Sequence, residues 1–124
     1  MLSSAKPVAF LASTDLDRSR QFYESVLGLR VVHADGFAVV VDAGEVTVRV
    51  TNVGERFNVQ SFTVFGWQVD DIREEIAELV DRGVQFLHVE GLEQDEAGVW
   101  AAPSGTHVAW FKDPDGNTLS LSDH

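Results

Sequence analysis

The sequence predicts an α+β fold in which one β-α-β-β-β module occurs twice in the chain. Valine is concentrated in short runs, which is typical of β-strands. Two other segments carry apolar residues at helical spacing and end at a glycine. A single offset superposes Gly28 on Gly83 and His33 on His88. A repeat of about 50 residues indicates two curved sheets that face each other.

The first helix is predicted between Thr14, the expected N-cap, and Gly28. The second begins at Asp70 or Asp71 and ends at Gly83. The first strands of the two modules align better when the offset is one residue longer than the offset that superposes Gly28 on Gly83. This difference implies one residue of slippage in the helix region.

Strands are predicted wherever alternating or β-branched runs lie between turn residues. In the first module these are Val8–Ser13, Leu29–His33, Phe37–Val41 and Val46–Thr51. In the second they are Phe62–Val69, Val84–Val89, His107–Lys112 and Thr118–Ser122. The modules span 8–51 and 62–122, a polar linker occupies 52–60, and the whole of 1–124 is expected to form a single domain. The stretch 91–105 has no strand or helix period and is predicted to be a loop.

Composition excludes several classes of partner and site. The 9 Lys and Arg residues stand against 20 Asp and Glu, and the net charge of −11 repels a nucleic-acid backbone. The longest apolar run, Phe37–Val41, is far shorter than the ~20 residues that span a membrane. The absence of cysteine excludes disulfides, thiolate metal sites and a cysteine nucleophile. No secretory signal is recognisable, so the expected location is the cytoplasm.

Two motifs resemble those of a known family. The run TDLDRSRQFY at 14–23, followed by VLGL at 26–29, resembles the opening of the vicinal oxygen chelate superfamily. The run FKDPDGN at 111–117 resembles its final hairpin. The superfamily includes glyoxalase I, extradiol dioxygenases, methylmalonyl-CoA epimerase, fosfomycin-modifying enzymes and bleomycin-binding proteins. The resemblance extends from about Val8 to Leu121. It implies a homodimer in which the curved sheets enclose a cup, the binding cavity, and each cup is formed either within one chain or between two.

The resemblance also implies four positions at which family enzymes hold a divalent metal. They fall on Val8, Arg49, Val64 and Ser120. Valine offers no donor atom, and Arg49 brings a fixed positive charge. We therefore expect no metal and no cofactor at these positions.

Histidines offer a second route to a metal or catalytic site. Strand alternation places His33 and His88 on the side that packs against the helices, away from the cup. His107 is expected to begin a strand, and His124 is the last residue of the chain. Each is interpreted as a structural residue, and no catalytic residue is predicted.

Strand alternation predicts which side chains line the cup, and the 91–105 loop is expected to cover its mouth. Arg49 either binds a ligand or pairs with an acid across the cup. The loop either contacts a ligand or is a surface loop anchored by one buried tryptophan, whereas Trp110 is expected in the core or an interface. The candidate ligand-binding residues are Phe10, Thr47, Arg49, Gln68, Asp95, Glu96, Trp100 and Ser120.

The favoured hypothesis is a metal-independent small-molecule-binding protein, similar to the bleomycin-binding branch, that sequesters an aromatic or cationic compound. The alternative is a glyoxalase-, epimerase- or dioxygenase-like enzyme with a displaced or absent metal. A third interpretation is a structural or partner-binding module whose cup is vestigial. The fold itself does not choose among them, because one fold supports many chemistries.

Overall fold

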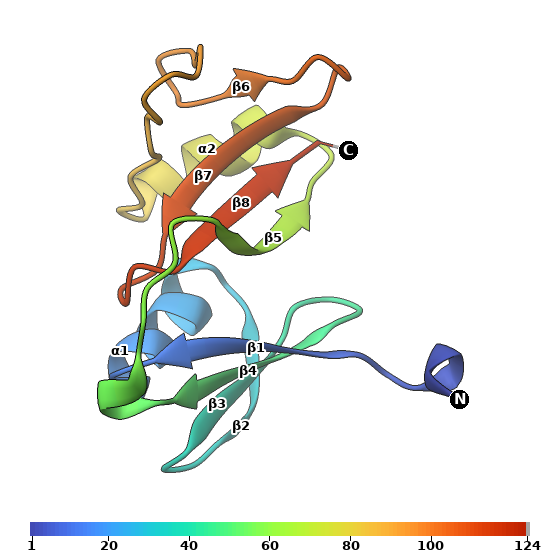
Figure 1. Cartoon of the computed structure of the whole chain (residues 1–124), viewed down its shortest axis with the longest axis vertical. Helices are drawn as coiled ribbons and strands as arrows, with labels where there is room; N and C mark the ends of the chain where they lie inside the picture. Colours follow the sequence, from blue (N-terminus) through green and yellow to red (C-terminus); the bar gives the residue numbers. More distant parts are fainter. Residues whose placement is uncertain (124) are drawn as a thin grey trace. The chain divides into compact units, whose positions relative to one another are not determined.

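The computed structural model describes residues 1–123 and consists of two compact units, Met1–Val59 and a second unit that begins at Gln60. His124 lies outside the described residues. In the described part of the chain, each unit has its own four-stranded sheet, which confirms the α+β class and the repeat (Figure 1). None of the helices in residues 1–123 is long and apolar enough to cross a membrane. That the two modules act as one domain stays a prediction.

Unit 1 contains the sheet β1-β4-β3-β2, in which β1 is parallel to β4 and the other pairs are antiparallel. Its helices are the short 3-10 turns η1 (Leu2–Ser4) and η3 (Gly54–Arg56), the α-helix α1 (Leu16–Arg20) and the π-helix η2 (Gln21–Val26). Its strands are β1 (Val8–Ser13), β2 (Arg30–Ala34), β3 (Ala38–Asp42) and β4 (Thr47–Asn52).

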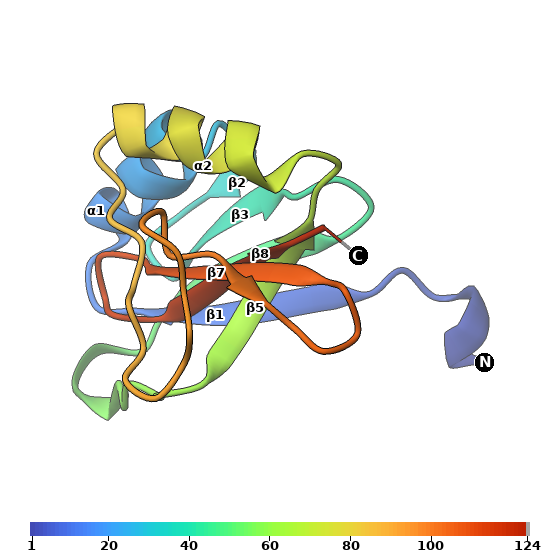
Figure 2. The ribbon, with the colours of Figure 1, turned by 90° about the horizontal axis from the view of Figure 1, so that it is seen from above.

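Unit 2 contains the sheet β5-β8-β7-β6, with β5 parallel to β8. Its helix α2 (Ile72–Asp81) lies along one face of this sheet (Figure 2). Its strands are β5 (Thr63–Gln68), β6 (Trp100–Ala101), β7 (His107–Lys112) and β8 (Thr118–Ser122). Under the helix, Phe111 is fully buried and contacts Trp67 and Phe86, with ring centroids 6.5 and 5.4 Å away.

Aspartates cap both α-helices, α1 and α2, and one of the two predicted caps is wrong. The carboxylate of Asp15, not the hydroxyl of Thr14, accepts a hydrogen bond from the backbone N–H of Arg18 at 3.1 Å. Asp71 makes the same contact with Glu74 N–H at 3.1 Å. A carboxylate at the N-cap also meets the positive end of the helix dipole.

The π-helix accounts for the slippage between the two repeats. One residue more separates the cap Asp15 from Gly28 than separates Asp71 from Gly83. A π turn accommodates an extra residue within a helix, and η2 provides such turns in unit 1. Both glycines lie at positive φ, 75° and 96°, where a side chain is strained.

The predicted strand Val84–Val89 is wrong. This segment makes only the isolated bridge between Phe86 and Phe111, with Leu87 N–H donating to Trp110 O at 2.8 Å. The two-residue strand β6, inside the predicted loop, pairs with the start of β7 instead. At the end of this segment, the backbone N–H of Val89 donates to the side-chain oxygen of Gln94 at 2.5 Å and not to a neighbouring strand.

Candidate functional site

One face of the unit 1 sheet carries three of the predicted ligand-binding residues. Phe10 of β1 lies opposite Arg49 of β4, which lies opposite Val40 of β3. Thr47 and Thr51 lie two residues on either side of Arg49 and point to the same face, while the intervening valines are buried on the helix side. Phe10, Thr47 and Arg49 therefore share one surface, as strand alternation predicted.

A β-bulge turns His33 onto this surface, which corrects the prediction that it packs toward the helix. The β2–β3 ladder shifts after Val31, so Val31 lies opposite Val41 but His33 lies opposite Val40. A bulge adds one residue to one strand and so reverses the alternation beyond it. The Nε2 of His33 is 2.9 Å from Asp35 Oδ2, and this hydrogen bond, with two backbone N–H donors, lowers the pKa of Asp35 to about 2.

The other two described histidines lie elsewhere in the fold. His88 is exposed beside α2, in unit 2. His107 begins β7 as predicted, and its Nδ1 is 2.7 Å from Asp123 Oδ2. Neither forms a group of three or more His, Asp or Glu side chains that could hold a metal, and residues 1–123 contain no such group.

In unit 2, the sheet face opposite α2 carries two tryptophans. Trp110 lies opposite Ser120, which lies opposite Gly66. Trp100 is on the same face, with its ring centroid 6.1 Å from that of Trp110. Gln68 lies two residues beyond Gly66 along β5. The structure thus brings Gln68, Trp100 and Ser120 together with Trp110, a half-buried residue of this face rather than of the core.

A cavity of about 460 Å³ opens beside this face, within the range of roughly 300–1,000 Å³ that small-molecule sites occupy. Trp110, Leu87 and Phe62 form its apolar walls. Lys112 and Thr63 supply polar groups at its edge, and the side-chain ammonium of Lys112 has no hydrogen bond or ion pair with any of residues 1–123. The cavity suits a molecule with a flat apolar body.

The loop before β6 is held by two of its own side chains. The carboxylate of Asp95 accepts from the backbone N–H of Val99 and of Ala97, both at 2.9 Å, and from Arg73 of α2 at 2.7 Å. The Val99 contact, followed by the Arg73 guanidinium, lowers the pKa of Asp95. The amide of Gln94 donates to the carbonyl of Gly98 at 2.7 Å and to that of Leu87 at 2.9 Å. Asp95 therefore already has cationic and N–H partners.

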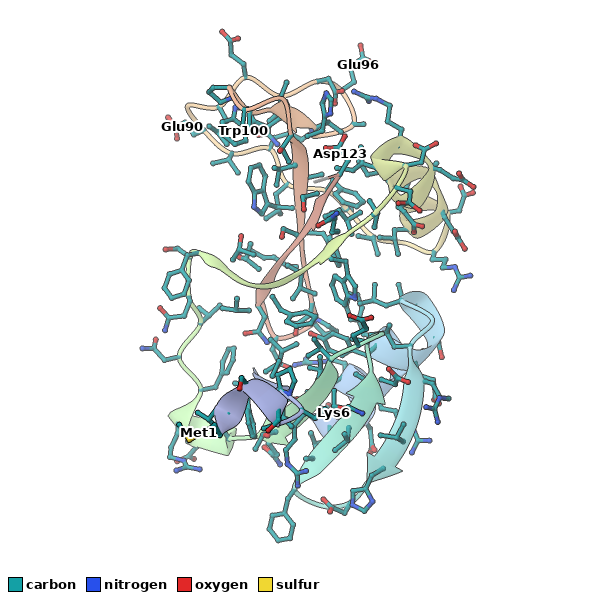
Figure 3. The ribbon with its side chains drawn as sticks, turned by 90° about the vertical axis from the view of Figure 1, so that its right-hand side faces the viewer. Met1, Lys6, Glu90, Glu96, Trp100 and Asp123 are labelled. Carbon is teal, nitrogen blue, oxygen red and sulfur yellow. The ribbon has the colours of Figure 1, made fainter. Side chains whose placement is uncertain are left out.

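Glu96, next to Asp95, points outward from the loop (Figure 3). It lines a second cavity of about 690 Å³ together with His88 and residues of α2. The structure thus separates Asp95 and Glu96, which contact the α2 side of unit 2, from the tryptophan face.

Comparison with known proteins identifies the family. A model of the Glyoxalase/Bleomycin resistance protein/Dioxygenase superfamily matches residues 6–121. The chain belongs to this superfamily. No curated protein matches the sequence.

Solved structures of the glyoxalase superfamily share the fold over almost the whole chain. One is a bleomycin resistance determinant encoded on the transposon Tn5, with 21% identity, a TM-score of 0.75 and 98% of each chain covered. Another is a lactoylglutathione lyase from Agrobacterium tumefaciens, with 21% identity, a TM-score of 0.69, and 96% of this chain and 92% of that chain covered. At these identities the likeness shows the fold alone.

The metal that glyoxalase-superfamily enzymes use does not fit the residues at the four corresponding positions. Val8 lies on β1 opposite Thr47, and Arg49 lies one row away, so a guanidinium occupies this part of the face. In unit 2 the β5–β8 ladder shifts between Thr63 and Phe65, so Val64 is the unpaired residue of a bulge and not a regular member of the face. Ser120 offers the one side-chain oxygen among the four, and a single neutral hydroxyl is not a set of ligands that holds a divalent ion.

Two residues of the unit 2 face escaped the sequence prediction: Trp110 and Lys112. Alternation within a strand predicts that Trp110 and Lys112 point to the same face of the sheet. Which face this is follows only from the pairing between β7 and β8, which places Trp110 opposite Ser120. That pairing is a tertiary property that local sequence does not encode.

Proposed function

We propose that this superfamily member is a metal-independent protein that binds a small aromatic molecule. The observation that carries the proposal is the aromatic face of unit 2, where Trp110 lies 6.1 Å from Trp100 and lines the 460 Å³ cavity. Aromatic side chains beside a few hydroxyl groups are typical of sites that recognise flat ligands. On the same face of unit 2, Gln68 and Ser120 are the further candidate contacts. Phe10, Thr47 and Arg49 form a separate candidate binding surface on unit 1.

The cationic ligand considered from the sequence receives less support. Asp95, the carboxylate expected to meet it, is engaged by Arg73 and two backbone N–H groups. By contrast, neither Arg49 nor Lys112 has a carboxylate partner in residues 1–123. The faces therefore favour a neutral or anionic aromatic compound.

The test uses N-phenyl-1-naphthylamine, a neutral aromatic dye that becomes fluorescent in apolar sites. We expect saturable binding that EDTA leaves unchanged. Trp110→Leu should weaken it about tenfold, since losing one aromatic contact removes about 1–2 kcal/mol of binding free energy. Trp67→Phe is the matched control, because Trp67 stacks on Phe111 under the helix and not on the candidate face.

Binding that requires added metal would contradict the proposal, as would equal affinity in the Trp110 variant and the control. No binding at all would instead favour the partner-binding module with a vestigial cup.

A metal-free enzyme is the second candidate, favoured by the position of His33. The bulge in β2 places this imidazole, which bonds to Asp35, opposite Val40 and therefore in the same row as Arg49. A histidine oriented by a carboxylate is a common general base. Turnover of a thiohemiacetal, an acyl-CoA or a catechol should then fall at least about a hundredfold in His33→Gln. Activity retained in that variant excludes this role.

We further propose that the chain forms a homodimer and acts in the cytoplasm. Phe10 and Phe37 in unit 1 and Phe62 in unit 2 are 67%, 78% and 61% exposed. Large exposed apolar side chains of this kind favour association between copies. Sedimentation equilibrium should give twice the mass of one 13.6 kDa chain, and a monomer at micromolar concentration would overturn the proposal.

A further inference from the structure

Arg49 is a half-buried cation without a counter-ion. No carboxylate of residues 1–123 lies within ion-pair distance of its guanidinium, and it makes no hydrogen bond with any of these residues. Removing a charge from water without a partner is unfavourable, so a guanidinium that is partly withdrawn from solvent favours an anionic partner. This arrangement is unusual in a chain with 20 Asp and Glu residues.

A second unsatisfied polar group lies beside it. The hydroxyl of Thr51 is buried and has no hydrogen-bond partner among the described residues. Buried hydroxyl groups nearly always have one. Thr51 lies two residues from Arg49 along β4, so both side chains point to the same face. Two neighbouring groups on one surface thus have N–H or O–H donors available.

The surroundings of these two donors are apolar. Phe10 and Val40 flank Arg49 in its row, and Ala12 and Ala38 flank Thr51 in the next. The carboxylate that follows on this face, Asp42, is already held by Arg30 at 3.0 Å. Low polarity around a donor strengthens its attraction to an anion.

We propose that this face of unit 1 binds the oxyanion of a small molecule, a carboxylate, sulfonate or phosphate attached to an apolar ring system. The guanidinium of Arg49 and the hydroxyl of Thr51 donate hydrogen bonds to its oxygens, and Phe10 contacts the ring. The inference rests on the proposed function, because it assigns a second binding face, on unit 1, to the same small-molecule-binding protein. Arg49 and Thr51 are then specificity-determining residues, and their lack of protein partners reflects their role in binding.

The test compares two dyes with one ring system, N-phenyl-1-naphthylamine and its 8-sulfonate derivative. The sulfonate should bind at least about tenfold more tightly, as expected for one charge-assisted contact. Arg49→Gln should remove this preference and leave the affinity for the neutral dye unchanged. Arg56→Gln makes the same charge change on the exposed η3 turn and should leave both affinities as they are.

The Thr51→Val variant distinguishes a role of Thr51 in ligand binding from a role in stability, because the two roles predict different results. Valine has nearly the same shape and removes a buried hydroxyl without a partner, so the variant should be at least as stable as the parent chain. Its affinity for the sulfonate should nevertheless fall about fivefold. A destabilised Thr51→Val, or sulfonate binding that is unchanged in both Arg49→Gln and Thr51→Val, would overturn the inference.

The two proposals fail in different ways. Binding of the neutral dye without a preference for the sulfonate retains the aromatic-binding function and rejects the oxyanion site. Failure of both dyes to bind rejects the proposed function and the inference together.

Discussion

Gly66→Ala is expected to destabilise the protein by about 3 kcal/mol, which is at the upper end for an added methyl group in a packed site. A Cβ at this position would lie 2.9 Å from the backbone carbonyl oxygen of Ser120 and would also overlap the Ser120 hydroxyl. The carbonyl belongs to β8, the parallel neighbour of β5, and cannot move without disturbing the ladder. Urea denaturation of the purified variant measures the change in free energy of unfolding.

Gly36→Ala is the matched control for this prediction. No atom lies within 4 Å of a Cβ at Gly36, and its backbone does not require glycine. This variant should match the parent chain or gain up to about 1 kcal/mol, because alanine reduces the entropy of the unfolded state.

Ser120→Ala in the Gly66→Ala background should restore only part of the loss. The substitution removes the hydroxyl but leaves the carbonyl in place. Full recovery in the double variant would show that the side chain alone excludes a Cβ. An unchanged urea midpoint in Gly66→Ala would show that β5 and β8 lie farther apart in solution.

Phe111→Ala is expected to cost about 3–5 kcal/mol, the usual range for removing a large aromatic side chain from a core. The ring of Phe111 is inaccessible to solvent and lies between Trp67 and Phe86 under α2. Its backbone also forms the one bridge that ties the 84–89 segment to the sheet. The variant leaves a cavity that this rigid layer cannot close, and calorimetry should show a melting temperature lower by roughly 10–20 °C.

Phe62→Ala provides the comparison, because it removes the same side chain in the same unit from a position that is 61% exposed. The change in stability should stay within about 1 kcal/mol. Equal losses in the two variants would mean that burial of Phe111 does not stabilise unit 2.

Helices and most strands were predictable because their signals are local. The apolar spacing of α2, its Asp71 cap and the positive φ at Gly83 all arise within one segment. The turn after β7 was likewise recognised from its sequence, and Asp113 Oδ1 accepts from Asn117 N–H at 2.9 Å within it. Thr14 failed as a cap because the adjacent Asp15 has the extended backbone that directs its carboxylate to the helix N-terminus.

The amino-acid sequence by itself determined the repeated α+β fold and the superfamily. Only the tertiary structure decided which side chains share a face at the bulges. The bulge near Val31 brings His33 to the Arg49 row, and the pairing of β7 with β8 places Trp110 beside Ser120. Side chains alternate with a period of two, so a one-residue shift in pairing reverses every face beyond it. Because that shift depends on the partner strand, no local pattern in the sequence could reveal it.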